Sequence, residues 1–190
     1  MTTPTPPGSG SAEVSTGGSA PASAPTTPGT PTATVPSSNA SAGPVGQDAV
    51  DALQAAMAAE HAALWAYGLV AAYAPDAANT VSDMLTSHQN IRDVTANLLV
   101  QAGATPVGPA PAYTTPEPVT DPRSAMALAL VIEGDCAAAW RSVIGHTDDS
   151  TLRGTALSAL TDSAMRMVTW RKLAKDKVVT APFPGAPDRD

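Results

Sequence analysis

Apolar residues recur every three or four positions along four stretches of the chain, a spacing typical of helices that bury one face. These stretches predict helices over about residues 48–73, 76–102, 121–145 and 149–177. No segment alternates between apolar and polar residues with a period of two, so we predict no strands. We therefore expect an all-α fold.

Helix-breaking and capping residues mark the ends of these stretches. Pro75 stops the first, and Gly103 is expected to follow the second in a left-handed conformation. Asp121-Pro122 opens the third, because proline suits the first position of a helix, and Gly145 ends it. Only short connections then remain within the first pair and within the second pair of helices. Each pair is therefore predicted to be an antiparallel hairpin.

A longer, proline-rich segment separates the two hairpins. Residues 104–120 contain five prolines, and an extended chain of this kind spans about 3.1 Å per residue, or roughly 50 Å in total. A helix of about 26 residues is roughly 39 Å long, so the segment can cross the whole bundle. Such a crossover between helices two and three is the ferritin-like arrangement. A disordered spacer between two separate helix pairs is the alternative.

The two ends of the chain differ in composition from the helical region. Residues 1–46 hold nine of the 19 prolines and no Leu, Ile or aromatic residue, so we expect a disordered tail. Residues 178–190 are expected to form a short C-terminal tail, inert rather than a docking peptide built around Phe183. Residues 47–177 then form a single four-helix domain.

Composition and charge exclude several classes of protein. No window approaches 18 consecutive apolar residues, and no basic stretch precedes an apolar run at the start, so we expect a cytoplasmic protein without a membrane span. The single cysteine, Cys136, excludes an internal disulfide and a metal–thiolate cluster. A net charge of −7 argues against nucleic acid as a partner. The basic residues from Arg166 to Lys177 suit the C-terminal turns of a helix.

Three ionisable residues, Glu60, His88 and Glu133, lie on core-facing positions near the middle of their helices. In an antiparallel bundle they share one level, and a charged group there must be paired or bound to a metal. The three side chains are therefore candidate ligands for one metal ion, iron or manganese. Asp162, near the middle of helix four, is a candidate further ligand.

A complete di-iron centre in such a bundle needs a Glu-x-x-His pair on each of two helices. Leu85 stands three residues before His88, and helix four offers Asp162 and Met165 in place of a glutamate and a histidine. The ligand set is therefore degenerate, which disfavours a di-metal oxidoreductase or iron oxidase.

A core network of ion pairs and hydrogen bonds is the alternative to a metal. Arg92 follows His88 by one helical turn, so its guanidinium could bind a glutamate, alone or with Arg141 or Arg166. Tyr67, two turns after Glu60 on the same face, is expected to belong to this polar core. The metal and network interpretations both stay open at this point.

Several short stretches along the chain are distinctive when taken together. They are Ala59 to Gly68, His88 with Arg92-Asp93, Gly103-Ala104 with Pro106, Ala112-Tyr113 to Pro118-Val119, and Glu133 with Ala139-Trp140-Arg141. These stretches resemble an actinobacterial ferritin-like family that is known as a domain of unknown function. The resemblance covers residues 47–177 and implies a ferritin-like four-helix bundle without an assigned activity. Of the superfamily's ligand pattern, only Glu60, His88 and Glu133 match.

Three functional hypotheses follow from these observations. The leading hypothesis is a ferritin-like bundle that binds one metal ion through Glu60, His88 and Glu133. The second is a metal-free structural or protein-interaction bundle, and the third is a di-metal oxidoreductase. Whether the chain is an enzyme stays uncertain, and no demonstrable activity is the preferred expectation. A homodimer and a protein partner that binds through the tails are further hypotheses.

Overall fold

The computed structural model describes residues 45–186, and the predicted N-terminal tail lies almost entirely outside this range. Four helices make up the described region: α1 (Gln47–Tyr73), α2 (Ala78–Gln101), α3 (Pro122–Gly145) and α4 (Ser150–Leu173). A short 3-10 helix, η1 (Pro75–Ala77), joins α1 to α2. No strand occurs within the described residues, which confirms the all-α prediction. The fourth helix ends at Leu173, four residues before the predicted end.

Specific side chains and backbone conformations set the helix ends. The Asp121 carboxylate accepts the backbone N–H of Ser124 at 2.8 Å, and Ser124 returns the interaction, which forms a capping box at the start of α3. Asp149 caps α4 in the same way by accepting the backbone N–H of Leu152 at 2.7 Å. Gly103 follows α2 with a φ of +79°, as predicted for a C-terminal glycine.

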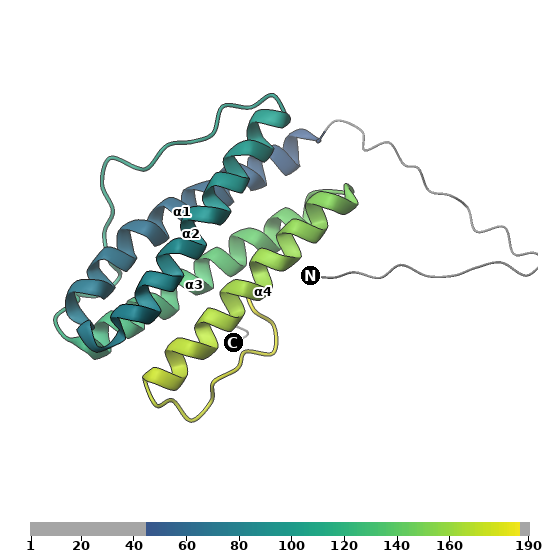
Figure 1. Cartoon of the computed structure of the whole chain (residues 1–190). Helices are drawn as coiled ribbons and strands as arrows, with labels where there is room; N and C mark the ends of the chain where they lie inside the picture. Colours follow the sequence, from purple (N-terminus) through teal and green to yellow (C-terminus); the bar gives the residue numbers. More distant parts are fainter. Residues whose placement is uncertain (1–44, 187–190) are drawn as a thin grey trace, which may run out of the picture. The chain divides into compact units, whose positions relative to one another are not determined.

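The proline-rich segment crosses the length of the bundle along α1, from the end of α2 to the start of α3 (Figure 1). The Gln54 side chain donates to the carbonyl of Thr105 at 2.8 Å and accepts the N–H of Val107 at 2.9 Å. Further along, the Trp65 ring stacks on Tyr113 with their centroids 5.4 Å apart. These contacts confirm the predicted crossover between two antiparallel hairpins, and with it the ferritin-like arrangement of the helices.

Two apolar clusters fill the bundle, one towards each end. Residues of the first include Leu53, Met57, Leu99, Trp140 and Leu152. Residues of the second include Tyr67, Val70, Val81, Leu128 and Trp170. In α1 and α2 the positions between the two clusters carry the buried residues Glu60 and His88, and the buried Glu133 of α3 lies at the same level. A polar layer therefore divides the core at mid-height.

The four helices do not enclose this layer evenly. Helix α1 packs against α2 and α3, and α3 packs against α4, whereas α2 and α4 make little backbone contact with each other. One side of the bundle is therefore more open than the others. No helix within residues 45–186 is long and apolar enough to cross a membrane.

The described part of the C-terminal tail packs against α3. Residues 183–186 form a turn in which the N–H of Ala186 donates to the carbonyl of Phe183 at 3.1 Å, with Pro184 second and Gly185 third. Gly185 has a φ of +71°, the conformation that a type II turn requires at this position. A side chain here would overlap the backbone of Ala137. This contact was not expected from the sequence, which suggested an inert tail.

Candidate functional site

The structure brings together the three ionisable residues that the sequence placed at one level. His88 lies between the two glutamates: its Nδ1 is 2.6 Å from Oε2 of Glu60, and its Nε2 is 3.1 Å from Oε1 of Glu133. None of the three side chains exposes any surface. Because an ionised carboxylate only accepts hydrogen bonds, a ring that faces one on each side is placed to donate from both nitrogens, as an imidazolium does.

Each glutamate has further donors that hold it in place. Trp140 donates its indole N–H to Oε1 of Glu60 at 2.9 Å. Tyr67 donates its hydroxyl proton to Oε1 of Glu133 at 2.5 Å, and the indole of Trp170 donates to the Tyr67 oxygen at 2.8 Å. The structure thus places Tyr67 in the polar core. Trp140 thus connects Glu60 to the first apolar cluster. Tyr67, which accepts from Trp170, connects Glu133 to the second.

A largely buried arginine from α4 completes the site. Arg166 donates from Nε to both carboxylate oxygens of Glu133 at 2.9 Å, and its Nη2 donates to Oγ of Ser163 at 2.9 Å. Its side chain is 12% exposed. We refer to Glu60, His88, Glu133 and Arg166 as the charged layer, since α1, α2, α3 and α4 each contribute one of its members.

The arginine proposed from the sequence for this role, Arg92, lies elsewhere. Its side chain is 30% exposed, and its Nε and Nη2 donate to Oδ1 of the neighbouring Asp93 at 2.9 and 2.7 Å. Arg92 satisfies its charge at the surface without desolvation, while Arg166 already binds Glu133. The prediction of Arg92 in the core network is therefore wrong. The other arginine considered, Arg141, is exposed.

The pKa shifts within the layer follow from burial and from these contacts. Burial alone would lower the pKa of His88, but its hydrogen bonds to Glu133 and Glu60 raise that pKa above its ordinary value. Burial alone would raise the pKa of Glu133, but the hydrogen bond from His88 and the charge of Arg166 lower it. Burial and the charge of Glu133 raise the pKa of Tyr67, which keeps its hydroxyl protonated as a donor.

The layer balances its own charges and hydrogen bonds. Two carboxylates face one guanidinium and one imidazole whose pKa is raised. No buried side-chain nitrogen or oxygen among the described residues lacks a hydrogen-bond partner. Buried charges are tolerated when they are paired in this way. The donor set therefore needs no additional cation to be satisfied.

These contacts do not fit a dinuclear metal centre. Such a centre would require a Glu-x-x-His pair on α2, which carries Leu85 before His88, and another on α4, which carries Asp162 and Met165 instead. Both oxygens of Glu133 already accept hydrogen bonds from Arg166. Asp162 is exposed and makes no hydrogen bond or ion pair within the described part of the chain.

A smaller ligand set exists that the sequence analysis did not identify. Ligand atoms of Glu60, His88 and Cys136 lie within 4.8 Å of one another, and all three residues are buried. Burial and the charge of Glu60 raise the pKa of the Cys136 thiol, and its Sγ lies 3.8 Å from the carbonyl oxygen of Ala59.

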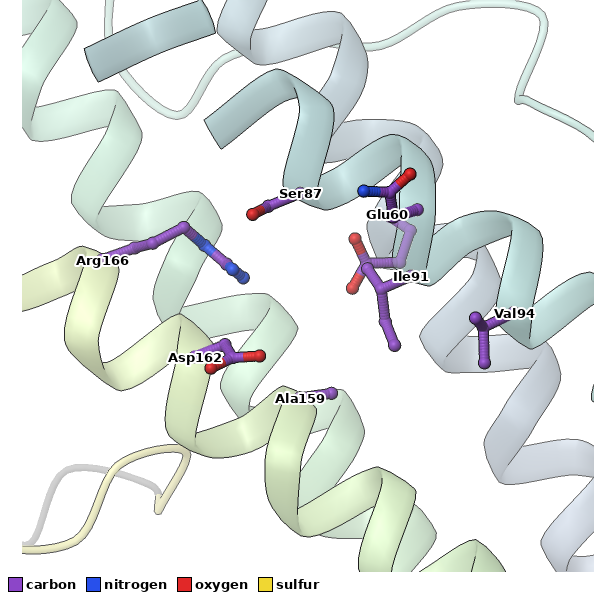
Figure 2. A pocket seen from close by; sticks show the side chains of 8 residues that line it. Glu60, Ser87, Ile91, Val94, Ala159, Asp162 and Arg166 are labelled. Carbon is purple, nitrogen blue, oxygen red and sulfur yellow. The ribbon is translucent and has the colours of Figure 1, made fainter. Parts of the chain in front are cut away.

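A cleft of about 270 Å³ opens between α2 and α4 and reaches the charged layer (Figure 2). Glu60 lies at its base. Helix α2 contributes Ser87, Ile91 and Val94, and α4 contributes Asp162 and Arg166. The side chains of Arg166 and Asp162 extend from α4 towards the space in front of α2 (Figure 2). Asp162 thus lines the approach to the layer.

A second cavity, of about 340 Å³, lies under the crossover and is lined by Trp65, Tyr113 and Asp135 among others. No member of the charged layer lines it. His61, the neighbour of Glu60 in the chain, contacts the crossover, with Nε2 3.2 Å from the carbonyl oxygen of Val107. The cavity that adjoins the candidate site is therefore the one between α2 and α4.

The sequence contained partial signals for these contacts. Arg166 was considered only as an addition to Arg92, because it is the first residue of a basic run that suggested the C-terminal turns of a helix. The indole N–H groups of Trp140 and Trp170 are a further signal, because a buried indole N–H needs an acceptor. Which acceptor each indole finds depends on how the four helices pack.

Comparison with known proteins identifies relatives of the whole helical region. A family model described as a domain of unknown function, DUF4439, matches residues 52–188 and so includes the C-terminal turn. The crystal structure of a conserved hypothetical protein, rv2844, from Mycobacterium tuberculosis matches with 35% sequence identity and a TM-score of 0.65, covering 67% of this chain and 98% of that one. No curated protein matches the chain at a significant level.

A more distant structural match shows the fold alone. It is a dodecameric thioferritin, the bacterioferritin-related protein of Bacteroides fragilis, with 17% identity and a TM-score of 0.58. The match covers 67% of this chain and 84% of that one. The arrangement of helices is thus ferritin-like.

Proposed function

Because the chain belongs to the DUF4439 family, whose function is unknown, we propose that its charged layer works without metal, in a ferritin-like bundle that serves as a binding module. The observation that carries this proposal is the contact between Arg166 and both oxygens of Glu133. In a metal centre, a metal ion would bind these two oxygens of Glu133. Here a permanently charged side chain takes it, because a guanidinium stays protonated at any physiological pH.

The position of His88 supports the same conclusion. Metal ions bind the neutral form of imidazole through a free ring nitrogen. Both ring nitrogens of His88 instead face carboxylate oxygens at hydrogen-bonding distance. Binding a metal would require His88 to lose a proton and to break at least one of these contacts. A di-metal oxidoreductase is disfavoured for the same reasons.

Metal analysis of protein purified without a histidine tag tests this proposal. We expect well under one equivalent of iron, manganese or zinc per chain, with the same trace content in the Glu60→Ala variant. Adding a chelator should leave the melting temperature unchanged. Stoichiometric metal in the wild-type protein, lost in Glu60→Ala, would overturn the proposal and restore the metal hypothesis.

A single-metal site is the second candidate, and the proximity of Glu60, His88 and Cys136 favours it. Carboxylate, imidazole and thiolate together suit Zn²⁺, or Co²⁺ as its spectroscopic substitute. Titration with Co²⁺ would give a thiolate-to-metal absorption band that the Cys136→Ser variant lacks. The ligand set Glu60, His88 and Glu133 would instead bind iron or manganese, and its Co²⁺ spectrum would not change in Cys136→Ser.

We also propose, from charge and composition, that the protein is cytoplasmic and binds neither nucleic acid nor membrane. The net charge of −7 argues against nucleic acid as a partner. The structural match from Bacteroides fragilis is described as dodecameric; for this chain we propose self-association as a homodimer. Light scattering of the purified chain, with and without residues 1–44 and 187–190, tests both dimer formation and a role of the tails in binding a partner.

A further inference from the structure

The cleft between α2 and α4 has the size of a site for a small molecule. Its volume of about 270 Å³ lies just below the roughly 300–1,000 Å³ of pockets that hold drug-sized ligands. The cleft exists because α2 and α4 make little backbone contact. It is therefore a feature of the helix arrangement rather than of one side chain's rotamer.

One half of the cleft carries polar groups without protein partners. Within residues 45–186, Nη1 of Arg166 makes no hydrogen bond, and the hydroxyl of Ser87 makes none either. The Asp162 carboxylate is likewise unpaired in the described region. Figure 2 shows Arg166 and Ser87 facing each other across the opening, with Asp162 one helical turn away from Arg166. Two donors and one carboxylate thus line the same cleft.

The rest of the cleft is mostly apolar. Ile91 and Val94 of α2 and Ala159 of α4 line it, together with Asn90 of α2 and with Glu60 at the base. Val94 is 43% exposed, a high value for a valine with neighbours on two helices. An apolar group placed between these side chains would remove their surface from water, which is favourable.

We propose that this cleft binds a small zwitterion of the amino-acid class with an apolar side chain. The ligand's carboxylate accepts hydrogen bonds from Nη1 of Arg166 and from the Ser87 hydroxyl, and its ammonium group binds Asp162. Its side chain lies between Ile91, Val94 and Ala159. This proposal rests on the metal-free function above, because the pairing of Glu133 with Arg166 directs the remaining guanidinium edge into the cleft.

Charge pairing explains why both ends of the ligand are needed. A simple carboxylate would meet Arg166 but would also lie near the unpaired carboxylate of Asp162. A simple amine would meet Asp162 but would lie near the guanidinium. Only a molecule that carries both charges satisfies both groups at once, and like-charge contacts penalise the alternatives. The cleft is too small for a second folded chain to enter.

A matched set of three ligands tests the proposal on the full chain by calorimetry. L-Leucine carries both charges, isopentylamine lacks the carboxylate, and 4-methylpentanoate lacks the ammonium group. We expect saturable binding of leucine, and binding of each analogue at least about tenfold weaker, or 1.4 kcal/mol. Equal binding of either analogue, or no binding by leucine, overturns the proposal.

Variants locate the binding site. Asp162→Asn keeps the size of an exposed side chain and should weaken leucine binding about tenfold, whereas Ser87→Ala should weaken it less. Asp135→Asn is the control, because Asp135 is another exposed acid and lines the cavity under the crossover instead. Leucine binding that is equally affected by Asp135→Asn, or unaffected by Asp162→Asn, contradicts the proposed site.

Indole signals in NMR spectra provide an independent readout. Trp140 donates to Glu60 at the base of the cleft, whereas Trp65 stacks under the crossover. Leucine should shift the Trp140 indole signal and leave that of Trp65 unchanged; the reverse pattern overturns the proposal. Metal content is measured on the same samples. Metal-free protein that ignores leucine refutes the ligand alone, and stoichiometric metal with intact leucine binding refutes the metal-free function alone.

Discussion

The closed and open sides of this bundle differ in the residues that line them. Where α1 meets α3, the buried residues include Ala63, Ala66 and Ala129, none more than 1% exposed. Where α2 faces α4, the cleft carries Asp162 and other polar side chains instead. Small apolar residues let helix backbones approach closely, whereas polar groups without partners keep a side hydrated. The same charged layer thus has one sealed face and one accessible face.

The largest effect should come from breaking the sealed side. Glu133→Ala removes the acceptor of Arg166, His88 and Tyr67 and leaves their donors buried and unpaired. We expect a loss of about 3–5 kcal/mol in the free energy of unfolding, as for other broken buried ion pairs. Urea unfolding measures it, with Asp135→Asn, two residues away on the exposed face of α3, as the control. A loss below about 1 kcal/mol would show that the layer does not stabilise the bundle.

A smaller effect should come from the turn that packs on the outer face of α3. Gly185→Ala forces a side chain into a left-handed conformation and into the carbonyl of Ala137, which should cost about 1–2 kcal/mol and expose the tail to proteases. Gly154→Ala is the matched control, because Gly154 lies within α4 with open space around it. That change should stabilise by about 0.5–1 kcal/mol. Equal effects of the two variants would contradict the close packing of the turn.

The charged layer should make the stability of the protein fall both at high pH and at low pH. The pKa of His88 is raised on folding. Its contribution to the free energy of unfolding is therefore complete below the unfolded pKa of 6.5 and is lost as pH rises through the folded pKa. The pKa of Glu133 is lowered on folding. Its contribution to the free energy of unfolding is therefore complete above the unfolded pKa of 4.5 and is lost as pH falls through the folded pKa. Urea midpoints should therefore be highest between about pH 4.5 and 6.5.

His88→Gln is the variant that isolates the alkaline branch of this profile. It should remove the decline above pH 6.5 and leave the acid branch in place, because Glu133 keeps its contact with Arg166. A wild-type profile that is flat from pH 6 to 9 would contradict protonation of His88 in the folded protein.

The smallest effect on stability should come from the open side. Asp162→Asn alters an exposed carboxylate without a protein partner, so the free energy of unfolding should change by less than about 0.5 kcal/mol. Comparison with Glu133→Ala then separates a group that holds the bundle together from one that faces a ligand. A loss above about 1 kcal/mol would mean that Asp162 has a structural role.

The helices and the crossover could be predicted because their signals are local. Apolar periodicity, capping residues such as Asp121, and the five prolines of residues 104–120 each act within a few turns of chain. The convergence of Glu60, His88 and Glu133 was also predictable, since helical phase and mid-helix position place a side chain without knowledge of its partner.

Local sequence signals could not decide whether Arg92 or Arg166 enters the polar core. A long guanidinium side chain can reach the core from a position beside the apolar stripe, so helical phase does not decide which arginine enters. The cleft depends on the separation of α2 from α4, which no single helix specifies. Likewise, Pro184-Gly185 signals a turn, but its contact with Ala137 depends on tertiary packing.

The distribution of the charged layer over the two hairpins bears on the order in which the molecule assembles. The first hairpin carries Glu60 and His88, which contact each other, and the second carries Glu133 and Arg166, which do so as well. Each hairpin is built from neighbouring segments and can therefore form its own ion pair early. When the two halves dock, each brings a neutral pair, and no isolated charge has to leave water.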